Sequence, residues 1–536
     1  MGHYARNLSK LWKGPELVQI LPGSLNIPSF LGTDTVDIWL EEQVWGHRFF
    51  NDQTPWLVLL EAIGLMAFRA EDQNCGKQVF TAPGFLHENL RYELKEARQL
   101  RRILFSDRQI DEIADQHAVS DGALWKRWFG THGQLGEDEF GYLQSRFVRF
   151  SSFRNAVNLL RGSEIEPHRK RRVTSRHLAP RGPAMLSADF GEDRKRKGSI
   201  NKDRKFFRRG GELLFLMLNR SGKTADLEPL VKDRLLLVRS RWNRLAEALS
   251  PPVPEPPVMF ANIGYLPLAH HDTYRTLGED WLALLSLKAL PDDNLSDPLM
   301  RLSSLAVVRY VLERATEVLK QSRPLMPIDA MGSTTAGIRK LSKDHCSVHR
   351  DMTRKAIERV VEDFIGGEAW KEVLLKPNPT KAALELVKFT FGFEPKEAED
   401  RTIARLPQAI REAALDGHND HLGLVPGFYA ELIGLAAKQG SARWYILSDA
   451  MLEAVVLANV AEPLEYEAFL EKLYKRYGFV IGTKIASAHY TGINDQQVKA
   501  NQRHLEERLR TLGLLKRLSD DCAFVVNPFW SNEVSG

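Results

Sequence analysis

The C-terminal quarter of the chain, residues 463–530, carries the pattern that most constrains the fold. Leu505, Leu509 and Leu512 follow one another at steps of four and three residues, which places them on one face of a helix. Gly513 comes next, at a place where many helices end in a left-handed residue. Two short apolar runs then flank the sequence Ser-Asp-Asp, and this spacing indicates a β-hairpin. The sequence therefore predicts a helix that ends at a glycine and is followed by two paired strands.

This order of elements resembles the end of a winged helix-turn-helix domain. Residues 434–445 resemble a second, more degenerate ending of the same kind, so two tandem modules would account for residues 405–530. In the winged-helix family, the helix before the hairpin often lies in the major groove of DNA, and the hairpin touches the DNA backbone. The resemblance implies DNA contacts from the cationic positions of the last helix and of the wing, which are Arg503, His504, Arg508, Arg510, Lys516 and Arg517.

A winged helix can also serve as a protein–protein module, because a fold does not determine a function. Asp520 and Asp521 at the tip of the predicted wing favour this alternative, since two carboxylates would repel DNA phosphates. The sequence leaves both interpretations open.

The composition places the chain among globular proteins. With 536 residues it is long enough for roughly three or four domains. Hydrophobic residues make up 43% and charged residues 27%, which is typical of a soluble protein. No apolar run has the length of a membrane span and the first residues lack a signal-peptide core, so we expect a cytoplasmic protein without membrane contact. Three widely spaced cysteines fit a reducing compartment.

Helical periodicity recurs along most of the chain and predicts a mainly α, multidomain helical protein, with small β-hairpins in its C-terminal winged-helix modules. We expect a Trp-rich helical domain over 1–135 and a helical domain with a basic loop over 136–250. A further helical domain is expected over 258–400 and the winged-helix region over 401–536. The proline-rich run at 251–257 marks the clearest boundary.

Residues 106–128 predict two short helices, with Ser106 or Asp107 at the start of the first and Ser120 at the start of the second. The pattern is similar to the helix-turn-helix of many DNA-binding proteins. It departs from that pattern at His117-Ala118, where glycine is preferred. An ordinary helical hairpin is the alternative.

Positive charge is concentrated between Arg146 and Arg209, where nineteen Lys and Arg residues face six Asp and Glu residues. This block carries +13 and, since the whole chain carries +5, the remainder carries −8. We expect a loop over 168–210 that binds the phosphates of double-stranded DNA without reading the base sequence. A solvated loop and a dock for an acidic protein are the alternatives. The candidate contacts are Arg169, Lys170, Arg171, Arg172, Arg194, Lys195, Arg196, Lys197, Lys202, Arg204, Lys205, Arg208 and Arg209.

The sequence predicts no catalytic residue and no cofactor. Residues 211–224 end in Gly-Lys-Thr after an apolar run, but Met217 stands where a P-loop needs glycine, so we expect a buried helix that ends near Gly222. The set His47, Asp52 and Glu61 is interpreted as a turn with buried hydrogen bonds rather than as an acid–base site.

No metal site is predicted either. His270, His271 and Asp272 are the best candidates for metal ligands, but no second cluster has ligand spacing. We therefore expect surface or helix-capping roles for these residues.

The chain as a whole also resembles accessory proteins of multigene bacterial anti-phage defence systems of the methylation-associated kind. The residues behind this resemblance are Trp45–Arg48, Asn51–Trp56, Phe206–Leu218 and Tyr474–Gly482. The resemblance implies a non-enzymatic DNA-binding or assembly subunit that works beside ATPase, methylase or nuclease partners. The alternatives are a protein–protein scaffold without DNA contact and a nuclease whose motif is hidden.

Overall fold

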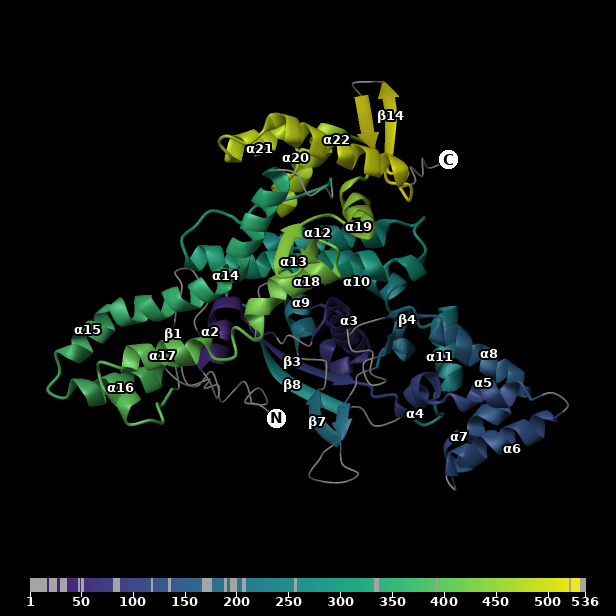
Figure 1. Cartoon of the computed structure of the whole chain (residues 1–536). Coiled ribbons are helices and arrows are strands. Elements are labelled where there is room, and N and C mark those ends of the chain that lie inside the picture. The colour runs from purple at the N-terminus through teal and green to yellow at the C-terminus, as the bar shows by residue number, and fades with distance from the viewer. Residues whose placement is uncertain are drawn as a thin grey trace.

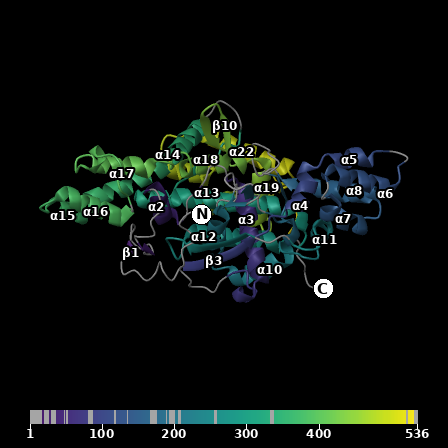
Figure 2. The ribbon, with the colours of Figure 1, turned by 90° about the horizontal axis from the view of Figure 1, so that it is seen from below.

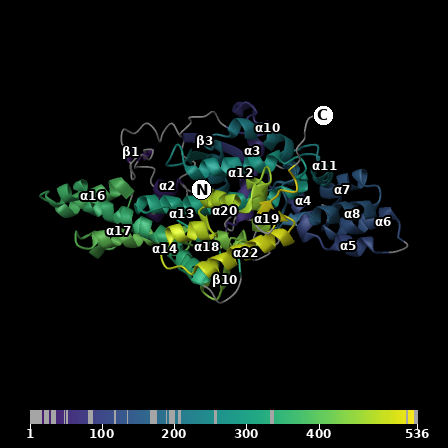
Figure 3. The same ribbon diagram turned by 90° about the horizontal axis from the view of Figure 1, so that it is seen from above.

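The computed structural model describes residues 17–18, 27–28, 36–46, 49, 53–80, 87–116, 119–133, 136–165, 176–187, 190–192, 200–204, 209–254, 258–331, 337–391, 393–519 and 522–530. Within these residues the protein is mainly helical with small β-hairpins, which confirms the predicted fold class. Figure 1 shows a central body with an arm on its left, a lobe on its right and the C-terminal segment above. The views from below and above in Figures 2 and 3 place arm and lobe at opposite ends of the body.

The central body is built around α13 (Ser296–Val318), which is buried along almost its whole length. Apolar or small side chains lie on every side of this helix, and such a helix is stable only when other elements surround it. Its buried Arg314 donates from Nε to the Val44 carbonyl at 3.0 Å. The surrounding helices are α2 (Val36–Trp45), α3 (Pro55–Glu71), α12 (Asp272–Ser286), α14 (Gly337–Gly366), α18 (Val425–Leu432) and α19 (Asp449–Asn459).

Two further helices of the body, α9 (Gly210–Asn219) and α10 (Thr224–Arg234), pack against α3 and α12 respectively. Every residue of α9 is buried, and Gly222 follows the helix with a φ of +72°, as the sequence predicts. Glu61 of α3 accepts hydrogen bonds from Gln53 Nε2 and from the Gly211 backbone, each at 3.0 Å. The Gly-Lys-Thr sequence thus joins the core helix α9 to the start of α10. His47 and Asp52, the other members of the predicted hydrogen-bonded set, lie outside the described residues.

The lobe has its own hydrophobic core, centred on aromatic side chains. The ring centroids of Trp125 and Phe150, and those of Trp128 and Phe153, lie 4.9 Å apart. Residues from both sides of the predicted boundary between 135 and 136 share this core. The elements of the lobe are α4 (Arg98–Arg101), the π-helical turn η4 (Arg102–Ser106), α5 (Gln109–Ala114), α6 (Asp121–Thr131), α7 (Gly136–Arg146), α8 (Phe150–Arg161), η7 (Pro183–Met185) and α11 (Arg241–Leu249).

Helices α5 and α6 are the helical pair predicted at residues 106–128. Ser120 occupies the N-cap position of α6. Asp107 accepts hydrogen bonds from the Gln109 backbone at 3.0 Å and from Trp128 Nε1 at 2.7 Å. The pair therefore packs its tryptophans into the lobe as a helical hairpin, and DNA recognition at this pair stays a prediction.

The arm extends from the C-terminal half of α14. It consists of α15 (Glu368–Leu374), α16 (Pro379–Phe391) and α17 (Leu406–Leu415). Phe364 and Phe391 meet at its centre, with ring centroids 4.7 Å apart. Short 3-10 turns lie at η3 (Gln73–Cys75), η8 (Asp292–Asn294), η9 (Glu399–Arg401) and η10 (Leu422–Leu424).

The strands form small sheets, and most of the pairs are antiparallel. The longest pair joins β3 (His87–Leu94) to β8 (Val258–Tyr265). Other antiparallel pairs are β1 (Leu17–Val18) with β2 (Ile27–Pro28), β4 (Glu164–Ile165) with β5 (His177–Leu178), β6 (Phe190–Glu192) with β7 (Ile200–Arg204), and β10 (Ala436–Gln439) with β11 (Ala442–Tyr445). The parallel pair joins β9 (Met326–Pro327) to β13 (Phe479–Val480).

The C-terminal segment has the predicted order of helix, glycine and hairpin. Gly513 follows α22 (Asp495–Thr511) with a φ of +75°, and Gly478 ends α20 (Tyr466–Tyr477) in the same left-handed conformation. The short helix α21 (Thr483–His489) lies between them. The hairpin consists of β14 (Leu515–Ser519) and β15 (Cys522–Val525), and β12 (Leu464–Glu465) extends it to three strands.

The second predicted module shows the same local order. Gly434 follows α18 with a φ of +78°, and the hairpin β10–β11 comes next. Ser448 then caps α19 by accepting a hydrogen bond from the Met451 backbone at 3.2 Å. No helix in the described part of the chain combines the length and the apolar character that crossing a bilayer requires.

Candidate functional site

Most of the predicted DNA contacts in the basic block lie outside the described residues. These are Arg169, Lys170, Arg171, Arg172, Arg194, Lys195, Arg196, Lys197, Lys205 and Arg208. Lys202 and Arg204 belong to β7, which pairs with β6, so the segment predicted as a loop contains a hairpin. Arg209 precedes α9 and donates from Nε to the Glu212 carboxylate at 2.8 Å. Arg209, a predicted DNA contact, is thus part of an ion pair within the protein.

Helix α22 presents its predicted DNA contacts on two different flanks. Arg503 and Arg510 are exposed and, at seven residues' separation, lie about 20° apart around the helix axis. His504 and Arg508 lie on the opposite flank. Arg508 donates to the Asp449 carboxylate at 2.5 Å and thereby fastens α22 to α19. Arg503 and Arg510 are therefore the pair presented to solvent away from α19.

The wing strand β14 carries the last two predicted contacts. Lys516 and Arg517 are both exposed. Because successive side chains of a strand point to opposite faces, the two cannot contact the same phosphate row. Arg517 reaches Glu506 at 3.9 Å. Lys499, which is not among the predicted contacts, is exposed about 40° from Arg503 around α22 and extends this cationic flank.

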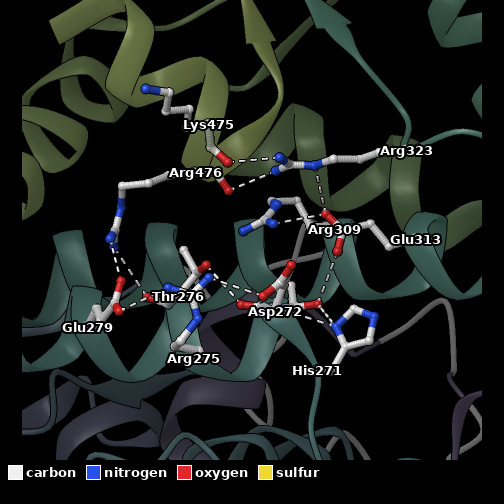
Figure 4. Close-up of polar contacts among 11 residues, drawn as sticks. His271, Asp272, Arg275, Thr276, Glu279, Arg309, Glu313, Arg323, Lys475 and Arg476 are labelled. Atoms are coloured by element: carbon white, nitrogen blue, oxygen red, sulfur yellow. Dashed lines mark hydrogen bonds and ion pairs between the residues drawn. The ribbon is translucent and has the colours of Figure 1, made fainter. Parts of the chain in front are cut away.

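A charged cavity of about 530 Å³ lies between α12, α13 and α20, far from the basic block in sequence. Figure 4 shows its polar side chains converging from these three helices. Helical spacing brings them together, since positions three and four residues apart share one helix face. Its cations are Arg275, Arg309, Arg323, Lys475 and Arg476, and its carboxylates are Asp272, Glu279, Glu313 and Glu317.

Glu313 lies between two guanidinium groups of the cavity. Its Oε1 accepts from Arg309 Nη2 at 2.8 Å and lies 3.5 Å from Arg323 Nε. Arg323 also donates to the carbonyls of Lys475 and Arg476, each at 2.8 Å, and so binds the C-terminal end of α20. Two cations therefore share a single carboxylate oxygen.

The wall formed by α20 is joined to α12 through Arg476. Its Nη1 donates to Glu279 and its Nη2 to Asp280, each at 2.5 Å. Tyr477 donates to the same Asp280 carboxylate at 2.7 Å. Burial raises the pKa of Asp280, and the positive charge of Arg476 acts in the opposite direction.

His271 has the helix-capping role that the sequence predicts. Its Nδ1 accepts from the Thr273 backbone at 3.1 Å at the start of α12, and its Nε2 lies 3.2 Å from Glu317. The Thr273 hydroxyl also contacts His271 Nδ1, so Thr273, His271 and Glu317 form a chain like that of a nucleophile, a base and an acid. Thr273 is fully buried, however, so a substrate cannot reach its hydroxyl group.

The charges of the cavity shift the pKa values of its side chains. Burial lowers the pKa of Arg323, and the nearby positive charge of Arg309 lowers it further. Burial alone would raise the pKa of Glu317, but hydrogen bonds from His271 and the charge of Arg314 bring it below its ordinary value. Across the described residues, no group of three His, Cys, Asp or Glu side chains is placed to hold a metal ion.

A smaller cavity of about 260 Å³ contains Cys346 and His349 of α14 beside Tyr445. Burial raises the pKa of the Cys346 thiol to about 12 and lowers that of His349 to about 3. The thiol is therefore protonated and the imidazole neutral near pH 7, which is the opposite of an activated thiolate. His349 Nδ1 is instead hydrogen-bonded to the Tyr445 hydroxyl at 2.7 Å.

The sequence points to His270, His271 and Asp272 of the charged cavity but not to the residues of its other walls. One signal was present: Arg309 and Glu313 stand four residues apart, and Arg314 and Glu317 three apart, inside a helix that is buried along most of its length. Charged pairs at helical spacing within a buried helix must be paired with each other or face a cavity. Comparisons with family models, with curated proteins and with solved structures gave no match.

Proposed function

We propose that this protein is a non-enzymatic DNA-binding and assembly subunit of a bacterial anti-phage complex. It contacts the phosphates of double-stranded DNA through the exposed cationic side chains of α22 and β14. The basic block over 168–210 adds further phosphate contacts. ATPase, methylase or nuclease subunits are the partners that the resemblance to defence proteins implies.

The observation that carries this proposal is the exposure of Arg503, Arg510 and Lys516. The apolar face of α22 is buried through Val498, Leu505 and Leu509, so the helix is held while its cationic flank stays in water. Cations that remain hydrated and mobile bind a phosphate backbone by releasing its counterions. They position a protein on DNA without reading the sequence of the bases.

The test measures the affinity for duplex DNA by fluorescence anisotropy at a series of salt concentrations. The variant carries Arg503→Gln, Arg510→Gln and Lys516→Gln. The logarithm of the affinity should depend less steeply on the logarithm of the salt concentration, by about 0.9 per lost phosphate contact. The control carries Lys376→Gln, Lys381→Gln and Lys396→Gln, which removes the same charge from exposed positions near or on the arm.

Equal salt slopes for the variant and the wild type would contradict contact through α22 and β14. A companion variant measures how much the basic block contributes to DNA binding. It has Ala in place of Lys195, Arg196, Lys197, Lys202, Arg204 and Lys205. If the wild type fails to bind duplex DNA even at low salt, the proposal is wrong, and the scaffold interpretation becomes the better one.

A further inference from the structure

We propose that the charged cavity between α12, α13 and α20 binds a phosphorylated small molecule of nucleotide size, and that Arg309 holds its phosphate group. This site is separate from the proposed DNA surface of α22 and β14. It involves none of the residues on which the proposed function depends.

Arg309 is the centre of the argument because it is buried but incompletely paired. It is 2% exposed, and its only hydrogen bond to a described residue is the one from Nη2 to Glu313. Its buried Nε has no hydrogen-bond partner among the described residues. Buried polar groups almost always have partners, so an unused guanidinium N–H beside a cavity points to a ligand that accepts hydrogen bonds. In Figure 4 this guanidinium lies in the middle of the group, between Thr276 and Glu313.

The geometry of the guanidinium group favours an oxyanion. Arginine presents a planar set of N–H donors that matches two oxygens of a phosphate group. Arg323 and Arg309 share the single oxygen Glu313 Oε1, and over the whole lining five cations stand against four carboxylates. The lowered pKa of Arg323 has the same origin, since burial and the charge of Arg309 disfavour its protonated form. A bound anion would relieve this repulsion.

The size and the remaining lining residues indicate more than an inorganic phosphate ion. The volume of about 530 Å³ is within the usual range for a pocket that binds a small organic ligand. Gln321 and His270 lie at the exposed rim with Lys475 and offer hydrogen bonds to hydroxyl groups or ring nitrogens. A nucleotide combines such groups with a phosphate, which is why this class fits the whole cavity.

The first experiment is isothermal titration calorimetry of the full chain with AMP, ATP, inorganic phosphate and adenosine. We expect one site for a nucleotide, weaker binding of inorganic phosphate and no binding of adenosine. Arg309→Gln should weaken nucleotide binding about tenfold or more, because it removes a charge-assisted bidentate contact. Arg301→Gln is the matched control: Arg301 lies on the same helix and is also paired with a carboxylate four residues away, but it does not line the cavity.

Three results would overturn the proposal. One is the absence of binding for every phosphorylated compound, and another is binding of adenosine as tight as that of AMP. The third is unchanged affinity in a folded Arg309→Gln protein, with folding checked by circular dichroism. If that variant does not fold, the nucleotide affinity of Lys475→Glu is the test. This rim side chain is 69% exposed, so its replacement leaves the core intact. Lys475→Glu should weaken ATP binding severalfold, and an affinity equal to that of the wild type would refute the site.

Discussion

The exposed cations of α22 and β14 and the paired cations of the charged cavity are residues of the same types in opposite environments. Arg503 and Arg510 stand in water, where their charge costs the fold little and salt screens it. Arg309 is buried and Arg476 partly buried, and both are held by carboxylates, because charges withdrawn from water are tolerated only when they are paired.

The difference teaches that the number of cations says less about function than their pairing does. An exposed arginine can bind a long polyanion such as duplex DNA, because its side chain adapts to the partner. A buried and partly paired arginine is fixed in advance, so it suits a small ligand of defined shape. Arg508 is intermediate, since it is a quarter exposed and paired with Asp449. Three substitutions can break or sharpen this comparison.

The largest effect is expected at Asp280. Asp280→Ala leaves Arg476 without its buried carboxylate, and removal of one partner of a buried pair costs about 3 kcal/mol or more. We expect the midpoint of thermal unfolding to fall by several degrees, as measured by differential scanning calorimetry. The control Asp297→Ala breaks a more exposed pair with Arg301 and should cost about 1 kcal/mol or less. Equal losses of stability in the two variants would show that burial does not make one ion pair more important to stability than the other.

A smaller effect is expected at Arg508. Arg508→Gln removes the ion pair with Asp449 and the hydrogen bond to the Leu447 carbonyl, which should cost about 1 kcal/mol. Arg503→Gln, on the same helix but without such contacts among the described residues, should change the free energy of unfolding by less than about 0.5 kcal/mol. Chemical denaturation of both variants tests this difference. A larger loss for Arg503→Gln would mean that the solvent-facing flank of α22 has a structural role.

The smallest effect concerns pH and Glu317. The folded protein holds the pKa of this carboxyl group below its ordinary value of 4.5, so its ionised form adds stability above that pH. This contribution is lost as the pH falls through the lowered pKa. The difference in unfolding temperature between the wild type and Glu317→Gln should therefore shrink between about pH 6 and about pH 3. Glu362→Gln, which removes an exposed carboxylate from another part of the protein, is the control, and a parallel decrease there would remove Glu317 as the cause.

Local features of the fold could be predicted from the sequence because each depends on a few neighbouring residues. Thr54 and Pro55 mark the start of α3, and Gly513 marks the passage from α22 to the hairpin. The buried helix α9 follows from its unbroken apolar run. In each case one short stretch contains both the signal and the element.

The charged cavity could not be predicted in this way, because α20 lies far along the chain from the other two walls, α12 and α13. The spacing of Arg309 and Glu313 points to a charged face of α13, but nothing in the sequence joins that face to Arg476 of α20. The shared core of the lobe could not be predicted locally either. Its Trp125 and Phe150 come from opposite sides of the boundary predicted at 135–136. Such arrangements depend on tertiary packing, which local periodicity does not record.

The pairing of β9 with β13 bears on the order in which a ribosome delivers the parts of this fold. The backbone N–H groups of Met326 and Ile328 donate to the carbonyls of Gly478 and Val480, and Asn501 bonds the Ile328 carbonyl and the Ala330 backbone. Their partners are synthesised about 150 residues later, which takes roughly 8–30 s at about 5–20 residues per second. Until then, these backbone groups must be hydrated or protected by a chaperone. A nascent chain that stalls before α20 therefore exposes the middle of the protein rather than only its end.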